Sequence, residues 1–544
     1  MNRSLASGIF SVVSTKVVVL IVTVVSTPLL YRFLGASAYG DYAVLLSAFA
    51  IYMIFVSSGI TDGVRKYLAE DRADPDWEAH VVGFYLRLAI WLAAIGILVM
   101  VVATDLGYVA FAFGEERAVY FYVLAILVVT AQFRDYARKT LMGFGLERYS
   151  EPLKVLDKLG FVAVAIPLTY VGFGVVGALL GHIVASTLVA LVGLALVHSR
   201  LSLASVFSRP SDRFPRKRML TFNSMSIVLV LLLMSLYHVD ILMLQHFRTS
   251  SEVGNYRAAL QIAEFLWFVP LALQTVFVHS TSELWSQNRT RKITDLTSRT
   301  TRYTFLLTAV MAVGLAALAD VAVPVYFGAE AEPAIEPLLL LLPGALGFAL
   351  ARPILAVSQG NGTLRYPVAA TGVAAGVNVV LNALLIPRYG MHGAAIATSV
   401  GYGLMFVFHC WSARLVGFDP LSDARLGRVA LATALAAVPI VALAAAITNP
   451  WLALLVVPPA GFVLYLGFAL LVGALDPAEP FEVLSTFPDP IGSRAADLQA
   501  RLEGVDTDAP RNWTQILLFG AGLSLLVAGL TVGVLGVDVQ AVIP

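Results

Sequence analysis

Long apolar runs alternate with short polar segments from one end of the chain to the other. Each run holds about twenty residues, the length of helix that crosses the hydrocarbon core of a bilayer. We therefore predict about fifteen membrane-spanning helices. Their expected ranges are 8–31, 42–61, 82–104, 118–137, 157–175, 177–197, 221–245, 255–280, 303–327, 337–357, 366–387, 392–413, 428–448, 450–474 and 513–536.

Composition agrees with this pattern. The 544 residues are 59% hydrophobic and only 13% charged, whereas a soluble domain carries about 25% charged residues. The net charge of +1 gives no field that would attract nucleic acid. The single cysteine, Cys410, excludes an intramolecular disulfide and a cysteine-based metal site. We expect an all-α integral membrane protein whose first run is an anchored helix, since it is too long for a cleaved signal peptide.

Basic residues indicate the orientation, because cytoplasmic loops carry an excess of lysine and arginine. With the N-terminus in the cytoplasm, the inner segments hold most of the cations, among them Arg65, Lys139 and Lys158. The outer segments hold only Arg32, Arg117, Arg248, Arg257 and Arg388. This alternation predicts a multi-pass protein of the cell membrane with a cytoplasmic N-terminus.

The chain shows a weak internal repeat. Three segments of the first half recur in the same order in the second half: 143–149 as 360–366, 38–42 as 252–256, and 166–172 as 386–390. The alternative is that Gly-x-Tyr and Pro-x-x-Gly are common turn sequences at membrane interfaces. If the halves are duplicated, each contains six spans and the repeats are parallel, an arrangement in which transporters bind substrate between the halves.

Three segments resemble the signatures of a known family. They are 28–42, beginning Pro-Leu-Leu-Tyr-Arg-Phe-Leu-Gly; Asp240 with 253–259, Val-Gly-Asn-Tyr-Arg-Ala-Ala; and the long stretch 378–398. Over residues 1–415 the chain is similar to the polysaccharide flippases of the multidrug, oligosaccharidyl-lipid and polysaccharide exporter superfamily. The sequence departs from that pattern by one further span after an acidic linker.

The resemblance implies two six-helix lobes around a central cavity, with extra C-terminal helices. The expected parts are an N-terminal lobe at 1–200, a second lobe at 201–415, a helix pair at 416–475, a cytoplasmic linker at 476–512, which could contain a short amphipathic helix, and a last helix within 513–544. The implied substrate is a polyprenyl- or dolichyl-phosphate or -pyrophosphate carrying a sugar chain. Glycosyltransferases or a glycan polymerase or ligase are possible partners, and the coupling ion stays open.

Charges deep inside spans are the first candidates for substrate contact. Each costs about 2.5–3.5 kcal/mol at a helix centre, so such residues usually have a function. Lys16 lies about eight residues, or about 12 Å, inside its span, and Glu264 lies about nine residues inside its own. We expect Lys16 to meet a phosphate, and Glu264 to meet a proton, a cation or Lys16 itself. A structural ion pair, or snorkelling by Lys16, is the alternative.

Five further residues are weaker candidates. Arg134 and Arg352 occupy corresponding spans and could form an entry patch for phosphate, or could snorkel to the inner interface. Asp240 is short and snorkels poorly, so it needs a polar partner. Asn378 and Asn382 lie one helical turn apart on one face, where they could bind sugar or hydrogen-bond a neighbouring helix.

The sequence contains no motif that is typical of an enzyme active site. There is no histidine pair at metal-ligand spacing, no Walker loop and no nucleophile elbow, and no cofactor is expected. A flippase needs only a polar path for its headgroup. The rival readings are a cation-coupled drug exporter of the same superfamily, a membrane glycan polymerase or ligase, and a scaffold for glycosyltransferases. A polymerase or ligase would need a long outer loop, which the sequence does not offer.

Overall fold

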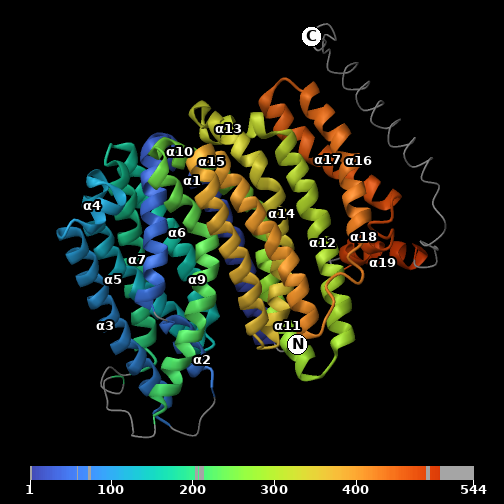
Figure 1. Cartoon of the computed structure of the whole chain (residues 1–544). Coiled ribbons are helices and arrows are strands. Elements are labelled where there is room, and N and C mark those ends of the chain that lie inside the picture. The colour runs from blue at the N-terminus through green and yellow to red at the C-terminus, as the bar shows by residue number, and fades with distance from the viewer. Residues whose placement is uncertain are drawn as a thin grey trace. The chain divides into compact units, whose positions relative to one another are not determined.

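The computed structural model describes residues 3–57, 59–70, 75–201, 206, 214–485 and 491–502. Within these residues the chain forms helices joined by short turns and contains no strand (Figure 1). Ten of the described helices are long and apolar enough to cross a membrane. The prediction of an all-α, multi-pass membrane protein is confirmed, and the expected span 513–536 lies outside the described residues.

Two helices each contain what the sequence indicated as two spans. Helix α1 (Arg3–Ser57) is broken at Gly35, where φ is 75°. Helix α15 (Arg365–Val416) is broken in the same way at Gly390, where φ is 55°. Only glycine adopts such angles without a steric penalty, so each break is a kink at one residue rather than a loop.

The other helices follow the hydrophobic runs closely, and most begin several residues earlier than expected. In chain order they are α2 (Ile60–Leu68), α3 (Trp77–Asp105), α4 (Tyr108–Phe113), α5 (Glu115–Gly143), α6 (Glu147–Tyr170), α7 (Gly174–His198), α9 (Arg216–Phe247), α10 (Ser250–Ala263), η1 (Glu264–Trp267), α11 (Phe268–Ser286), α12 (Thr290–Ala317), α13 (Ala319–Phe327), η2 (Ala329–Ala334), α14 (Ile335–Gly360), α16 (Leu426–Ala446), α17 (Pro450–Leu471), α18 (Glu479–Leu484) and α19 (Ile491–Leu502).

The chain divides into two compact units that are interleaved in sequence. The first comprises Met1–Ile262, Tyr326–Leu341 and Val368–Leu404. In it, α3, α5, α6 and α7 lie side by side with α1 and α9 (Figure 1). A buried cluster that includes Tyr67 and Tyr136 packs one end of these helices together. The expected lobe boundary near residue 200 stays a prediction.

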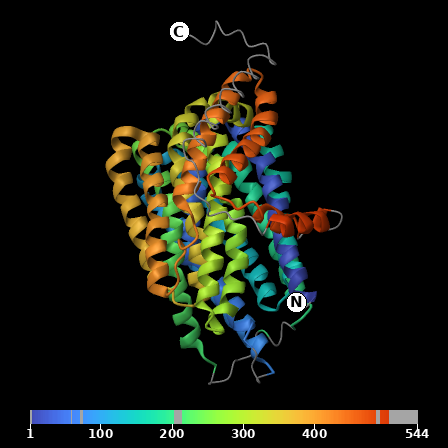
Figure 2. The same cartoon turned by 90° about the vertical axis from the view of Figure 1, so that its right-hand side faces the viewer.

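The second unit comprises Ala263–Val325, Leu342–Pro367 and Met405–Pro544. Its C-terminal hairpin, α16 and α17, packs on α12 through an apolar cluster that includes Ile440 and Phe468. The segment expected as a linker contains α18 and α19, and α19 runs across the direction of α16 and α17 (Figure 2). Helix α19 covers the stretch where the sequence suggested a short amphipathic helix.

Candidate functional site

The first unit contains a cavity of about 190 Å³ that is lined by both polar and apolar side chains. Helices α1, α6, α9 and α10 supply its lining. From α1 come four hydroxyls, which belong to Thr23, Ser26, Thr27 and Ser47. A hydroxyl-rich cavity among apolar helices offers hydrogen bonds to a ligand that hydrocarbon would exclude.

Two cations line this cavity from opposite halves of the sequence. Lys158 is in the middle of α6, and Arg257 is in the second turn of α10. The Lys158 ammonium lies 5.3 Å from the centre of the Phe161 ring, and among the described residues it has no ion-pair partner. Arg257 donates to Gln261 Oε1 at 3.1 Å. Two such charges inside a bundle favour an anion, and arginine matches phosphate geometry well.

Aromatic side chains form another part of the lining. Tyr39, Tyr42 and Phe161 all border the cavity. Behind them, the Tyr42 hydroxyl is 2.7 Å from His182 Nε2, and the His182 ring lies 4.2 Å from that of Phe161. These contacts fix the two rings in place. The result is a rigid surface with apolar faces and hydroxyl edges, which suits a sugar.

A second polar cluster is fully buried next to the cavity. The Asp240 carboxylate accepts hydrogen bonds from Tyr256 Oη at 2.5 Å, Thr398 Oγ1 at 3.0 Å and the Ile241 amide at 2.8 Å. Asn378 donates to Thr398 at 3.5 Å, and Asn382 donates to Asn378 at 3.2 Å. The structure thus brings together three of the predicted residues, Asp240, Asn378 and Asn382.

This cluster has the donors that a hard cation prefers. Asp240 supplies a carboxylate, Asn378 and Asn382 supply amide oxygens, and Thr398 supplies a hydroxyl. The Asn382 Oδ1 atom is buried and accepts no hydrogen bond. Oxygen ligands of these types hold hard cations in proteins, so the set fits a small cation as well as a proton on Asp240.

The cavity and the cluster share two helices. His238 and Ile241 of α9 border the cavity, while Asp240 between them faces the cluster. On α10, Arg257 borders the cavity and its neighbour Tyr256 bonds Asp240. A shift of either helix would therefore move both polar groups together.

The remaining predicted residues have other surroundings. Arg134 bonds Asp135 at 3.0 Å and Ser186 at 3.0 Å, so it belongs to a paired cluster on α5, α6 and α7. Lys16 of α1 is half-buried and lies in the field of Glu151 and Lys154. Its predicted role as a phosphate ligand stays a prediction.

Glu264 and Arg352 belong to the second unit. Glu264 opens η1, a short 3₁₀ turn between α10 and α11, and such turns inside long helices often mark hinges. Arg352 is buried, with its guanidinium 4.0 Å from the centre of the Phe348 ring. The roles predicted for both residues stay predictions.

Lys158 and Arg257 are the functional candidates that the sequence did not indicate. Both lie near the ends of expected spans, so the sequence analysis assigned Lys158 to an inner segment and Arg257 to an outer segment. Helix α6 begins at Glu147, ten residues before the apolar run, and this extension places Lys158 at the helix centre. If the helical periodicity of the apolar run had been followed back through the charged segment 147–157, it would have predicted the longer helix and so the position of Lys158.

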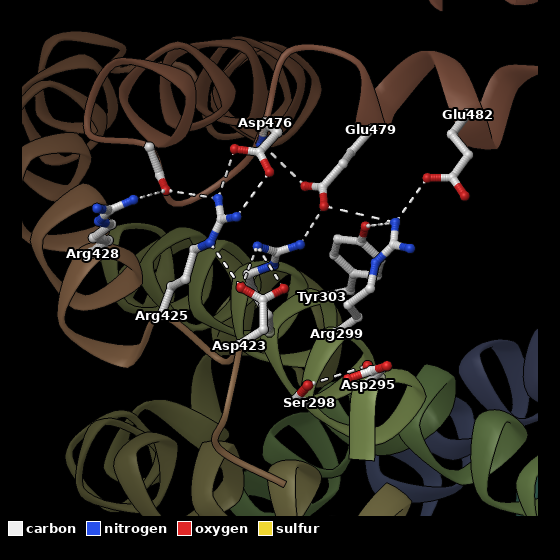
Figure 3. A network of polar contacts seen from close by, with 12 residues as sticks. Asp295, Ser298, Arg299, Tyr303, Asp423, Arg425, Arg428, Asp476, Glu479 and Glu482 are labelled. Atoms are coloured by element: carbon white, nitrogen blue, oxygen red, sulfur yellow. Dashed lines mark hydrogen bonds and ion pairs between the residues drawn. The ribbon is translucent and has the colours of Figure 1, made fainter. Parts of the chain in front are cut away.

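A separate ionic network lies in the second unit (Figure 3). Arg302 of α12 is fully buried and pairs with Glu479 and, at 3.3 Å, with Asp423. Arg425 pairs with Asp476 at 2.7 Å, and the hydrogen bonds that it donates to the Asp476 carboxylate raise the pKa of the Arg425 guanidinium, so it stays charged. The network joins α12 to the segments that flank α16 and α17.

Family comparison agrees with the architecture. The model of a family described as polysaccharide biosynthesis protein matches residues 5–276, which is half of the chain. The chain belongs to this family. A second model, described as lipid II flippase MurJ, matches residues 158–460.

Individual relatives are distant. The chain is 24% identical to the probable low-salt glycan biosynthesis flippase Agl15 of Haloferax volcanii, over 70% of this chain and 77% of that protein. It is 22% identical to the uncharacterized membrane protein MJ1068 of Methanocaldococcus jannaschii, over 68% of this chain and 76% of that protein.

Solved structures show the same fold. A lipid II flippase MurJ in an inward closed conformation has a TM-score of 0.68 at 13% identity, covering 85% of this chain and 97% of that one. An inward-facing multidrug resistance transporter of the MATE family has a TM-score of 0.63 at 17% identity, covering 76% of this chain and 99% of that one. The two-lobed transporter fold expected from the sequence is confirmed.

Proposed function

We propose that this family member is a flippase for a lipid-linked oligosaccharide. It moves a polyprenyl- or dolichyl-phosphate or -pyrophosphate that carries a sugar chain from the inner to the outer leaflet, by alternating access. The observation that carries the proposal is the pair of cations, Lys158 and Arg257, in a hydroxyl- and aromatic-lined cavity inside apolar helices. The likeness to a glycan biosynthesis flippase supports it.

Each part of the cavity has a task in this scheme. Lys158 and Arg257 hold the phosphate, while Tyr42 and the hydroxyls of α1 face the sugar. The lipid tail stays in the bilayer, because only the headgroup needs a polar path. The protein breaks no covalent bond and is not an enzyme, and its product feeds surface polysaccharide or glycoprotein assembly, which links it to glycosyltransferases or a glycan polymerase or ligase.

The Asp240 cluster supplies the energy coupling. A cation or proton that enters it exchanges the hydrogen bonds of Asp240 and shifts the packing of α9 and α10, which also border the cavity. The cell membrane, with the N-terminus in the cytoplasm, is the proposed location. The distribution of basic residues supports it.

Reconstituted protein tests the phosphate site. Lys158→Gln and Arg257→Gln are each expected to weaken substrate binding about 10- to 150-fold, since a charge-assisted hydrogen bond contributes about 1.5–3 kcal/mol. The assay follows a short-chain lipid-linked sugar across proteoliposomes. Lys139→Gln is the matched control, because this lysine of α5 forms only a long, partly exposed ion pair. Equal rates in all three variants would remove the cavity as the substrate site.

A gene deletion tests the proposal in cells. A complete lipid-linked oligosaccharide is expected to accumulate on the cytoplasmic face, with loss of the surface glycan. If the lipid-linked sugar still reaches the outer face and only its polymerisation or transfer fails, the protein is a glycan polymerase or ligase instead.

A further inference from the structure

The two copies of the repeated segment touch each other in the first unit. Gly40 of α1 and Gly254 of α10 are equivalent positions in 38–42 and 252–256. A Cβ atom at Gly40 would lie 1.9 Å from the Ser250 carbonyl oxygen, and one at Gly254 would lie 1.9 Å from the Ala36 carbonyl oxygen. The contact is reciprocal, backbone against backbone, and leaves no room for any side chain.

One arginine spans this contact. Arg117 of α5 bonds Asp41 Oδ1 at 2.6 Å and Ser250 Oγ at 2.5 Å. With its amide oxygen turned toward the guanidinium, Gln245 accepts a further bond at 3.0 Å. Arg117 and Asp41 come from the first half of the sequence, and Ser250 and Gln245 come from the second.

The contact borders the cavity described above. Tyr39 and Tyr42, on either side of Gly40, line that cavity. The Tyr31 hydroxyl of α1 donates a hydrogen bond to Asn255 of α10 at 2.8 Å, and the Tyr31 ring meets the Tyr39 ring edge to face, with centroids 5.2 Å apart. These residues close the space between α1 and α10 on the side that carries Gly40.

We propose that the Gly40–Gly254 contact is a gate of the transport path and that Arg117 is its latch. This inference rests on the proposed function only for the identity of the cargo. A sugar phosphate cannot pass between two backbones in contact, so α1 and α10 must separate. On separation Arg117 keeps its bond to Asp41, within its own half, and loses those to Ser250 and Gln245. The latch therefore biases the gate toward closure without binding substrate.

Thiol labelling tests the gate without any transport assay. The native cysteine is buried, and Cys410→Ala gives a cysteine-free background. A reporter, Ser26→Cys, lies in the cavity wall and is buried in the closed state. In sealed vesicles, a membrane-impermeant thiol reagent on the outer side is expected to label Arg117→Ala about tenfold faster than the parent, because charge-assisted bonds across the gate are lost.

Three variants sharpen the comparison. Gly40→Ala forces the helices apart and is expected to label fastest. Arg117→Lys keeps the charge but loses the fork geometry, so it falls between parent and alanine variant. Arg388→Ala removes an exposed arginine of the same end and is expected to label like the parent.

Unchanged labelling in both Arg117→Ala and folded Gly40→Ala would overturn the gate, as would equal acceleration in Arg388→Ala. If labelling rises as expected but no lipid-linked sugar moves, the gate stands and the proposed cargo fails. If the sugar moves while labelling stays constant, only the gate fails.

Discussion

Arg302 is the residue whose loss the structure predicts to be most costly for stability. Its side chain has 0% exposure, and its guanidinium pairs with Glu479, itself only 10% exposed, and with Asp423. Arg302→Gln removes the closest cation from the buried Glu479 carboxylate and leaves it only the longer contact with Arg299, at 3.8 Å. Breaking a buried ion pair in this way costs about 3–5 kcal/mol. We expect the free energy of unfolding to fall by that amount.

The same helix supplies the control. Arg299, three residues earlier, has a side chain that is 41% exposed and pairs with Glu482, which is 51% exposed. An exposed pair contributes about 0–1 kcal/mol, so Arg299→Gln is expected to change little. Thermal unfolding of both variants in detergent, followed by tryptophan fluorescence, compares them directly. Equal shifts in melting temperature would refute the reasoning, because they would show that burial does not set the strength of this network.

Three further predictions concern transport. Asp240→Asn preserves the size of the side chain but removes its charge, so we expect flipping in proteoliposomes to lose its response to an imposed cation or proton gradient; a retained response would make the cluster purely structural. Tyr42→Phe removes the hydrogen bond to His182 and costs about 1 kcal/mol, visible as a lower melting temperature and slower flipping, and a variant that matches the parent in both would show the bond to be dispensable. Lys16→Ala and Glu264→Gln are each expected to slow flipping, and native rates in both would end their predicted roles.

Much of the helical architecture could be predicted from hydrophobic runs, because bilayer thickness alone sets their length. The helix boundaries could not. Helix α6 continues through the charged segment 147–157, where Ser150 donates to the Arg138 carbonyl of α5 and Asp157 pairs with Arg134 of α5. A hydropathy pattern cannot distinguish such a segment from a loop. For this reason the sequence analysis placed Lys158 in a loop, and one of the two cations of the cavity was not predicted.

The candidate residues show a similar limit. Spacing on one helix face was enough to expect Asn378 and Asn382 to act together, and they share a hydrogen bond of 3.2 Å. Their link to Asp240 runs through Thr398 and depends on the packing of α15 against α9, which brings together positions 158 residues apart in the chain. Arg117 could be predicted least of all. Its place in the sequence assigns it to an outer segment, but it does not indicate that the side chain bridges Asp41 and Ser250.

The repeated segment explains how a symmetric fold can carry an asymmetric function. Its tyrosine occurs in both halves, as Tyr42 and Tyr256. Tyr42 bonds a histidine, His182, whereas Tyr256 bonds a carboxylate, Asp240. A carboxylate among amide and hydroxyl oxygens fits a cation, whereas the positive charge of Lys158 near the His182 imidazole disfavours one. Under the proposed coupling, an ion would therefore act on the second copy of the segment and not on the first.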